Sequence, residues 1–348
     1  MSQVVDHLAR LTGFRDRDVM DVTLVAALRD LLEPLSVAIF RCSGHGVDGG
    51  QERWLTRARL SVGDVIATAD PLWADPASLP LATDHPLRLD CMRSRSVRQE
   101  QDGERWITVF PIATDREVVG VLELASAERL KPKDQRLVTS VLRIYHNFLG
   151  LLDYSERDTL TGLLNRKTFD ESFIKLLGEL PADSSEADDG RRHAGSSSYF
   201  LGVIDIDHFK RVNDGFGHLI GDEVLLLLSR LMRNSFRFHD LLFRFGGEEF
   251  VVLMRCEQGA IADAAHAFER LRHNAEHYVF PQVGCITVSV GITQVRPDDL
   301  PASAFERADN ALYHAKHNGR NQVCNHAELV ATGQMTEQLA PASNVELF

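Results

Sequence analysis

Acidic side chains stand beside a predicted glycine turn, where carboxylates can hold a divalent cation. Residues 241–254 read LLFRFGGEEFVVLM, two apolar runs around Gly246 and Gly247, and this pattern predicts a β-hairpin. Glu248 and Glu249 follow the glycines, where backbone without side chains leaves room for a ligand. Carboxylates in this place suit a hard cation that carries a phosphate. A plain solvated turn is the alternative.

A second acidic group follows a short apolar run. Residues 199–204 (YFLGVI) predict a buried strand, and Asp205 and Asp207 come directly after it. An acid at the end of a buried strand is costly unless it is paired or holds a metal. We assign Asp205 to a metal and Asp207 to the N-cap of the helix that follows. The first amides of that helix can bind phosphate oxygens, and Lys210 lies one turn in, where it can meet a phosphate.

Two polar residues frame the glycine-rich stretch 215–221, which we interpret as a bend between helices. The pairing edge of guanine offers two neighbouring donors that one carboxylate accepts, and Asp222 suits this role with Asn213 as a second contact. Adenine would leave polar groups unpaired at Asp222, a discrimination of roughly a few kcal/mol. The alternative is that both residues cap helices.

The remaining pattern of this half alternates helices and strands. Helices are predicted at 165–180, 224–232, 264–277 and 303–318, and a further strand at 286–293. Lys316 and Arg320 stand four residues apart at the end of the last helix, so we expect them on one side. Residues 181–198 are a polar insert that predicts a loop.

The first half of the chain predicts a separate domain and a connecting helix. A helix is predicted at 19–32, strands at 37–40 and 54–60, an irregular segment at 68–100, and a hairpin of 105–113 with 117–125. This order, with WITVFPI and EVVGVLEL in the hairpin, resembles a GAF domain. The resemblance implies a domain that binds a small molecule, whose identity the sequence does not give, or that only dimerises. Cys91 is the one residue flagged as a possible sensor, and a packed thiol is its alternative.

A long helix follows residue 133, and its apolar residues recur at 3-4 spacing. This seam indicates either packing on its own domain or pairing with a second copy, and we favour pairing because the helix joins two domains. The seam consists of Val138, Val141, Tyr145, Phe148, Leu152 and Ser155.

Composition bounds the class of protein. The length of 348 residues predicts about two domains, and a net charge of −12 argues against a general nucleic-acid or anionic-membrane binder. Five scattered cysteines without a CxxC pair indicate reduced thiols and a cytoplasmic location. No apolar run reaches the roughly 18 residues of a membrane span. We divide the chain into a GAF-like domain at 1–135, a helical stalk at 136–157, a catalytic domain at 158–325 and a flexible tail at 326–348.

Five sequence blocks together resemble the GGDEF domain of diguanylate cyclases. They are DTLTGLLNR (158–166), DIDHFKRVNDGFGHLIGDE (205–223), RFGGEEF (244–250), VSVGI (288–292) and ADNALYHAKHNGRN (308–321). The resemblance implies an α+β fold related to nucleotidyl cyclases and the polymerase palm, with a mostly antiparallel sheet flanked by helices. It also implies condensation of two GTP into cyclic di-GMP and two pyrophosphates, at a site shared by the two subunits of a homodimer.

The resemblance assigns roles to matching residues. Asp205, the Ile206 carbonyl and Glu248 would bind Mg²⁺ or Mn²⁺, and Glu248 would help to deprotonate the attacking hydroxyl. Glu249 is a second motif acid. The residues assigned to GTP are Lys210, Asn213 and Asp222, with Lys316 and Arg320 on phosphates.

Arg237 and Asp240 form an RxxD motif shortly before the glycine turn. The resemblance implies an inhibitory site for cyclic di-GMP there, since arginine pairs bidentately with phosphate or guanine. A catalytically silent receptor for GTP or cyclic di-GMP is the alternative to an enzyme. A cyclase for another cyclic dinucleotide is disfavoured by Asp222.

Overall fold

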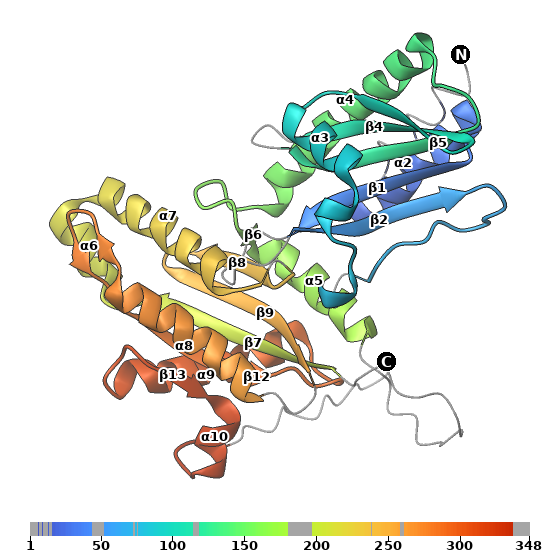
Figure 1. The fold of residues 1–348 in the computed structure, drawn as a ribbon. Coiled ribbons are helices and arrows are strands. Elements are labelled where there is room, and N and C mark those ends of the chain that lie inside the picture. The colour runs from blue at the N-terminus through green and yellow to red at the C-terminus, as the bar shows by residue number, and fades with distance from the viewer. Residues whose placement is uncertain are drawn as a thin grey trace, which may run out of the picture. The chain divides into compact units, whose positions relative to one another are not determined.

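The structure is a computed structural model of residues 1–348, shown in Figure 1. It describes residues 16–43, 52–71, 76–113, 118–179, 197–237, 239–257 and 261–336, together with positions 6, 9, 13 and 74. The chain divides into two compact units, Met1–Ser155 and Glu156–Phe348, which we call the amino-terminal and carboxy-terminal units. The insert 181–196, the turn at 114–117 and most of the loop 43–50 lie outside the described residues.

The amino-terminal unit is built on a five-stranded antiparallel sheet in the order β2-β1-β5-β4-β3. Because side chains alternate along a strand, the sheet presents two apolar faces. One face packs against helices α2 and α4, and the other packs against α3. The strands are β1 (Ser36–Ser43), β2 (Arg53–Ser61), β3 (Arg98–Asp102), β4 (Arg105–Ala113) and β5 (Val118–Ser126).

Most predicted elements of this unit are confirmed. Helix α2 spans Arg17–Leu32, and the predicted hairpin is formed by β4 and β5. The prediction of an irregular segment at 68–100 is wrong in part, because it contains helix α3 (Pro86–Ser94) and the start of β3. Neither element shows the spacing of apolar residues that predicts a helix or a strand. Helix α3 is short, and β3 reads RQEQD at an edge of the sheet.

Helix α4 (Pro132–Glu156) is part of the core of its own unit. Val138, Val141 and Tyr145 of the predicted seam are buried against the sheet and α2. The preference for pairing this seam with a second copy is therefore wrong, since its apolar side chains are already covered. The exposed apolar residues of α4 are Leu151 and Tyr154, outside the seam.

The carboxy-terminal unit has a six-stranded mixed sheet in the order β13-β12-β7-β9-β8-β6. The four central strands are antiparallel, and the two edge strands run parallel to their neighbours. This confirms the predicted α+β fold with flanking helices. The strands are β6 (Leu164–Asn165), β7 (Ser197–Ile206), β8 (Leu241–Gly246), β9 (Glu249–Glu257), β12 (Val288–Gln294) and β13 (Val323–Asn325), beside a small hairpin of β10 (Val279–Phe280) and β11 (Gly284–Cys285).

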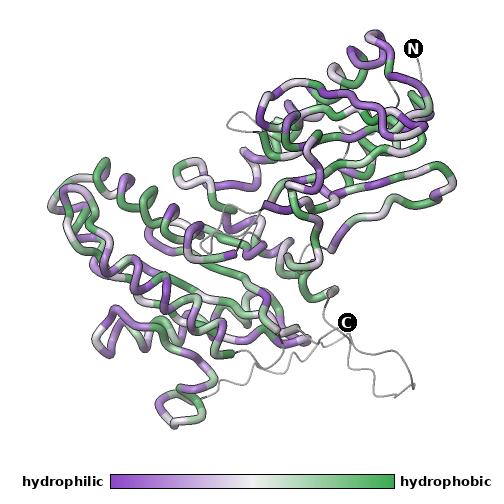
Figure 2. Tube along the Cα trace, viewed as in Figure 1, coloured by the Kyte–Doolittle hydropathy of each residue, from purple (hydrophilic) through white to green (hydrophobic). Residues whose placement is uncertain are grey.

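The helices of this unit are α5 (Arg166–Glu179), α6 (Phe209–Phe216), α7 (His218–Ser235), α8 (Ile261–His277), α9 (Pro301–His317) and α10 (His326–Ala331). Helix α9 lies very close to β12, because a Cβ on Gly291 would stand 2.0 Å from the Ala308 carbonyl oxygen. Glycine here lets the helix backbone rest on the sheet. Figure 2 shows that the helices carry both hydrophilic and hydrophobic positions along their length.

One expectation for this unit is corrected. The segment predicted as a flexible tail begins with α10, whose Leu329 is buried with Ala311 and Cys324 of the preceding elements. In the described part of the chain, no helix is long and apolar enough to cross a membrane.

Candidate active site

Asp205 occupies the end of the central strand β7. The strand register sets it opposite Glu249 of β9 on one side and Ser289 of β12 on the other. Asp205 is buried, at 7% exposure, and its side chain accepts a hydrogen bond from the Lys316 ammonium at 2.8 Å. Burial raises the pKa of Asp205 to about 6, against the opposing effect of Lys316 and with a further rise from Glu248 and Glu249. A nearby cation would stabilise the ionised form of this buried carboxyl and lower its pKa.

The predicted hairpin brings Glu248 and Glu249 to the same end of the sheet. Strands β8 and β9 pair antiparallel around the turn, and Gly246 and Gly247 have φ of 140° and 51°. Side-chain residues rarely adopt such values, so the turn needs glycine. Glu248 and Glu249 are half-buried, and neither side chain has a hydrogen-bond or ion-pair partner among the described residues. Lys316 pairs with Asp205, and Glu248 and Glu249 lie near enough to raise the pKa of Asp205, so this edge keeps negative charge for a cation.

The donors at this edge fit a hard divalent metal. Asp205, the Ile206 carbonyl and Glu248 offer oxygen ligands only, which Mg²⁺ and Mn²⁺ accept. They supply fewer ligands than such an ion takes, so phosphate and water would complete its shell. Asp205, Glu248 and Glu249 do not already form a closed cluster of ligand atoms. Among the described residues, such a cluster, with all ligand atoms within 4.8 Å of one another, is found only on α8, at His273, Glu276 and His277.

Asp207 is structural, and its predicted role as a helix cap is wrong. His208 takes the cap position of α6 and makes no side-chain cap bond. Asp207 is instead buried at 6% exposure and accepts hydrogen bonds from Thr287 Oγ1 and Ser289 Oγ at 2.7 Å and from the Asn321 amide at 3.0 Å. It thereby ties the loop after α9 to the end of β7. The three partners are distant in sequence, which hides this role from local pattern.

The corner between α6 and α7 holds Asn213 against Gly221. A Cβ on Gly221 would stand 2.0 Å from Asn213 Oδ1, so the amide packs over the bare glycine backbone. Asp222, the next residue, is exposed, and Lys210 is exposed in the first turn of α6. The structure thus places Asn213 beside the residue that precedes Asp222.

The two cations predicted on one helix face are separated. Lys316 lies in the last turn of α9 and contacts Asp205. The helix ends at His317, so Arg320 lies beyond it with φ of 61° and is exposed. The expectation that Lys316 and Arg320 lie on one side of the last helix is wrong for Arg320. Gly319, with φ of 112°, turns the chain away from the helix before Arg320.

Arg244 of β8 is a site residue that the sequence analysis missed. Its Nη1 donates to the two oxygens of Asp158 at 3.0 and 3.2 Å, and its Nη2 and Nε donate to the Gly247 carbonyl oxygen at 2.8 and 3.2 Å. Asp158 also accepts bonds from the Thr161 amide and hydroxyl, at 2.8 and 2.7 Å. Arg244 therefore clamps the glycine turn to the first loop of the unit. The arginine directly before FGGEE was the available signal.

The comparison with known families addresses this unit. Residues 155–322 match the family described as "Diguanylate cyclase, GGDEF domain". The chain contains a GGDEF domain. The family predicted from the five sequence blocks is thus confirmed for this part of the chain.

Two curated proteins and one solved structure illustrate what this chain is similar to. Diguanylate cyclase DgcP of Pseudomonas aeruginosa is 35% identical over 255 residues, 72% of this chain and 33% of the relative. Response regulator PleD of Caulobacter vibrioides is 35% identical over 202 residues, 56% of this chain and 41% of the relative. The GGDEF domain of DgcB from Caulobacter crescentus, solved with c-di-GMP, is 31% identical, with a TM-score of 0.43 over 49% of this chain and 96% of that one. The chain spans about a third to two fifths of these two curated relatives.

The RxxD residues lie at the other end of β8 from the glycine turn. The Arg237 amide donates to Asp240 Oδ2 at 2.8 Å, so the motif forms a closed turn with the Arg237 side chain exposed. Asp240 is buried at 6% exposure, and its Oδ1 has no hydrogen-bond partner among the described residues. Strand β8 spans six residues, and at ~3.3 Å per residue it separates this turn from the GGEEF turn by about 20 Å.

Asp240 predicts a pH dependence of stability. Burial raises its pKa from 3.8 to about 7, against opposing effects of the Arg237 amide, Arg237 and Arg270. The folded state then holds the proton more tightly than the unfolded state, so this contribution is present below pH 3.8 and is lost as pH rises toward 7. The asparagine of Asp240→Asn does not titrate, so the free energy of unfolding of this variant should not fall over this pH range. The two proteins should differ in this fall by roughly a few kcal/mol. Urea unfolding across this pH range measures it, and parallel curves for both proteins would contradict it.

Proposed function

We propose that this chain is a diguanylate cyclase, which condenses two GTP into cyclic di-GMP and releases two pyrophosphates. The observation that carries the proposal is the acidic edge of the GGDEF domain, where Asp205 pairs with the Lys316 ammonium and Glu248 and Glu249 lie near enough to raise the pKa of Asp205. The relatives named as diguanylate cyclases support it. GTP is a cytoplasmic nucleotide, which supports the predicted location.

The residues of the edge divide the work between binding and proton transfer. Asp205, the Ile206 carbonyl and Glu248 hold Mg²⁺ or Mn²⁺, which when bound offsets charge on the phosphates and acidifies the attacking hydroxyl. Glu248 accepts the proton of the 3′-hydroxyl. Lys210 and Arg320, both exposed, bind phosphate oxygens. Lys316 is paired with Asp205 at 2.8 Å, and in this proposal it also binds a phosphate.

The chemistry requires two GTP molecules and therefore two copies of the domain. The 3′-oxygen of one GTP forms a bond to the α-phosphorus of the other, and the bond from that phosphorus to the bridging oxygen of the β-phosphate breaks. Pyrophosphate leaves with the electron pair, and the same exchange in the other direction closes the ring. A homodimer that presents two sites to each other is part of the proposal.

The proposal is tested with the purified chain, GTP and MgCl₂. We expect cyclic di-GMP and pyrophosphate in a 1:2 ratio by chromatography and pyrophosphate assay, and no product from ATP. Cyclic di-GMP formation must stop when EDTA exceeds Mg²⁺. Tight binding of GTP without turnover, measured in parallel, would show a silent receptor and overturn the enzyme assignment.

The guanine contacts make a separate prediction at Gly221. Gly221→Ala introduces a Cβ 2.0 Å from Asn213 Oδ1 and displaces the amide. The loss of one hydrogen bond to guanine, roughly 1.5 kcal/mol, should raise the KM for GTP about tenfold with a smaller change in kcat. Gly215→Ala is the matched control, because its Cβ meets nothing within 4 Å. Equal KM values for the two variants would remove Asn213 from the guanine site.

Product inhibition at the RxxD turn is a further part of the proposal. The exposed Arg237 side chain offers a guanidinium to a guanine nucleotide, and Asp240 holds the turn by accepting from the Arg237 amide at 2.8 Å. We expect cyclic di-GMP to inhibit the wild type, and Arg237→Ala to raise the inhibitory concentration by at least about tenfold through loss of a charge-assisted pair. Initial rates at fixed GTP and rising cyclic di-GMP test this, and identical inhibition curves would contradict it.

For the amino-terminal unit we propose a GAF-like domain that regulates the GGDEF domain. The order of its elements, with a helix, two strands, a variable middle, a hairpin and a closing helix, supports this. Cys91 is buried and its thiol lies 3.4 Å from the Val109 carbonyl oxygen, while burial raises its pKa to about 12. An inert packing thiol is therefore its better description.

A further inference from the structure

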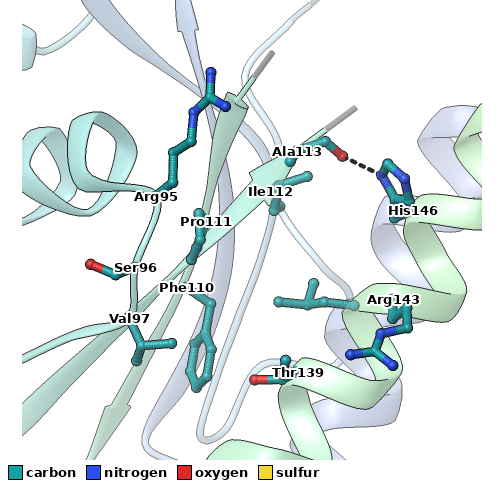
Figure 3. Close-up of a pocket in the computed structure, with 11 residues that line it drawn as sticks. Arg95, Ser96, Val97, Phe110, Pro111, Ile112, Ala113, Thr139, Arg143 and His146 are labelled. Carbon is teal, nitrogen blue, oxygen red and sulfur yellow. Dashed lines mark hydrogen bonds between the residues drawn. The ribbon is translucent and has the colours of Figure 1, made fainter. Parts of the chain in front are cut away.

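The amino-terminal unit contains a pocket that none of the functions above uses. It lies between α4, the end of β4 and the connection from α3 to β3, on the sheet face that α2 and α4 cover (Figure 3). Its volume is about 400 Å³, within the usual range for small-molecule sites. The lining residues are Arg95, Ser96, Val97, Phe110, Pro111, Ile112, Ala113, Thr139, Leu142, Arg143 and His146.

The inner wall of the pocket is apolar. Phe110 and Ile112 come from β4, Val97 from the α3–β3 connection and Leu142 from α4. Phe110 and Ile112 belong to the core of the unit, so this wall is rigid. Figure 3 shows the Phe110 ring and Val97 side by side at the base of the pocket. Such a wall suits an aromatic or short aliphatic group.

The charged residues of the described lining are two arginines. Arg95 and Arg143 line the pocket beside His146, and none of the lining residues that the structure describes is acidic, although the chain as a whole carries a net charge of −12. Arg95 and Arg143 are exposed and have no hydrogen-bond or ion-pair partner among the described residues. The His146 Nδ1 lies 2.7 Å from the Ala113 carbonyl oxygen, which fixes the ring at the wall (Figure 3). Two guanidinium groups without a partner among the described residues are therefore available to bind an anion beside an apolar wall.

We propose that this pocket binds a small amphipathic carboxylate. Its carboxylate lies against Arg143, which pairs with carboxylates through two parallel hydrogen bonds, and its apolar body lies on Phe110 and Leu142. A polyphosphate suits the pocket less, because half of its wall offers no hydrogen-bond donor. The inference does not depend on cyclase activity.

A ligand in this pocket would contact α4 directly. Thr139, Leu142, Arg143 and His146 recur at i, i+3, i+4 and i+7, so they form one face of that helix. A ligand bound there joins this face to β4. Helix α4 ends at Glu156, where the GGDEF domain begins.

The test compares 4-phenylbutyrate with its uncharged amide, 4-phenylbutyramide, by titration calorimetry on the full-length protein. We expect the carboxylate to bind at least about tenfold more tightly than the amide, as one charge-assisted pair predicts. Arg143→Glu should lose this preference. Arg136→Glu, an exposed arginine of α4 outside the lining, should keep it.

A second variant tests the cavity independently of charge. Thr139 is exposed at the pocket, and its hydroxyl bonds only the local Gln135 carbonyl, so Thr139→Trp fills the opening without disturbing the core. It should abolish binding of both compounds. Equal affinity for acid and amide, absence of binding to wild type, or equal losses in Arg143→Glu and Arg136→Glu would each overturn the proposal.

Discussion

Glu248→Gln is expected to retain GTP binding and to lower cyclic di-GMP formation by about 10³-fold. General-base contributions are typically 10²–10⁴-fold, and the amide also weakens a metal ligand. Gln keeps the size of Glu, and Glu248 has no partner in the described structure whose loss would unfold the turn. The measurement is single-turnover product formation with GTP affinity determined in Ca²⁺.

The control for this prediction is Glu171→Gln, an exposed acid on α5. It makes the same change in charge outside the acidic edge and should retain wild-type rates. Activity of Glu248→Gln within about tenfold of wild type would exclude Glu248 as the proton acceptor, since that loss lies below the range for such a residue.

Arg244→Ala is expected to lower activity by about 100-fold, although Arg244 touches neither nucleotide nor metal in this proposal. Its guanidinium fixes the Gly247 carbonyl to Asp158, so its removal frees the turn that aims Glu248. A displacement of about 1 Å at a reacting group can cost 10²-fold. The fall should appear in kcat more than in KM, because Glu248 is mispositioned and the guanine contacts are not.

Two variants separate positioning from loss of charge. Arg230→Ala removes an exposed arginine from α7 and should have no effect. Asp158→Asn breaks the other side of the clamp, and in combination with Arg244→Ala it should add little, because both act through one contact. Additive losses in the double variant would contradict the clamp.

The sequence predicted what depends on local pattern. The hairpin at 241–254 was found because two apolar runs and a glycine pair lie within 14 residues, and Asp205 was found because it ends a short apolar strand. The five sequence blocks then identified the family, which the match over residues 155–322 confirms.

The remainder depends on contacts between distant segments. Asp207 accepts from Thr287 and Asn321, 80 and 114 residues away, and no local rule separates that role from a helix cap. The α4 seam showed that one face is apolar but not which surface covers it. Gly221 shows the same limit, since its lack of a side chain matters only beside Asn213.

The ion pair of Asp158 with Arg244 has a mechanical consequence. Helix α4 ends at Glu156, and only Arg157 separates that end from Asp158. We therefore expect twisting or fraying of the final helical turn to reach the GGEEF loop through one intervening residue and one guanidinium. A stimulus that changes this short connection would change the orientation of Glu248, the carboxylate that we propose as proton acceptor.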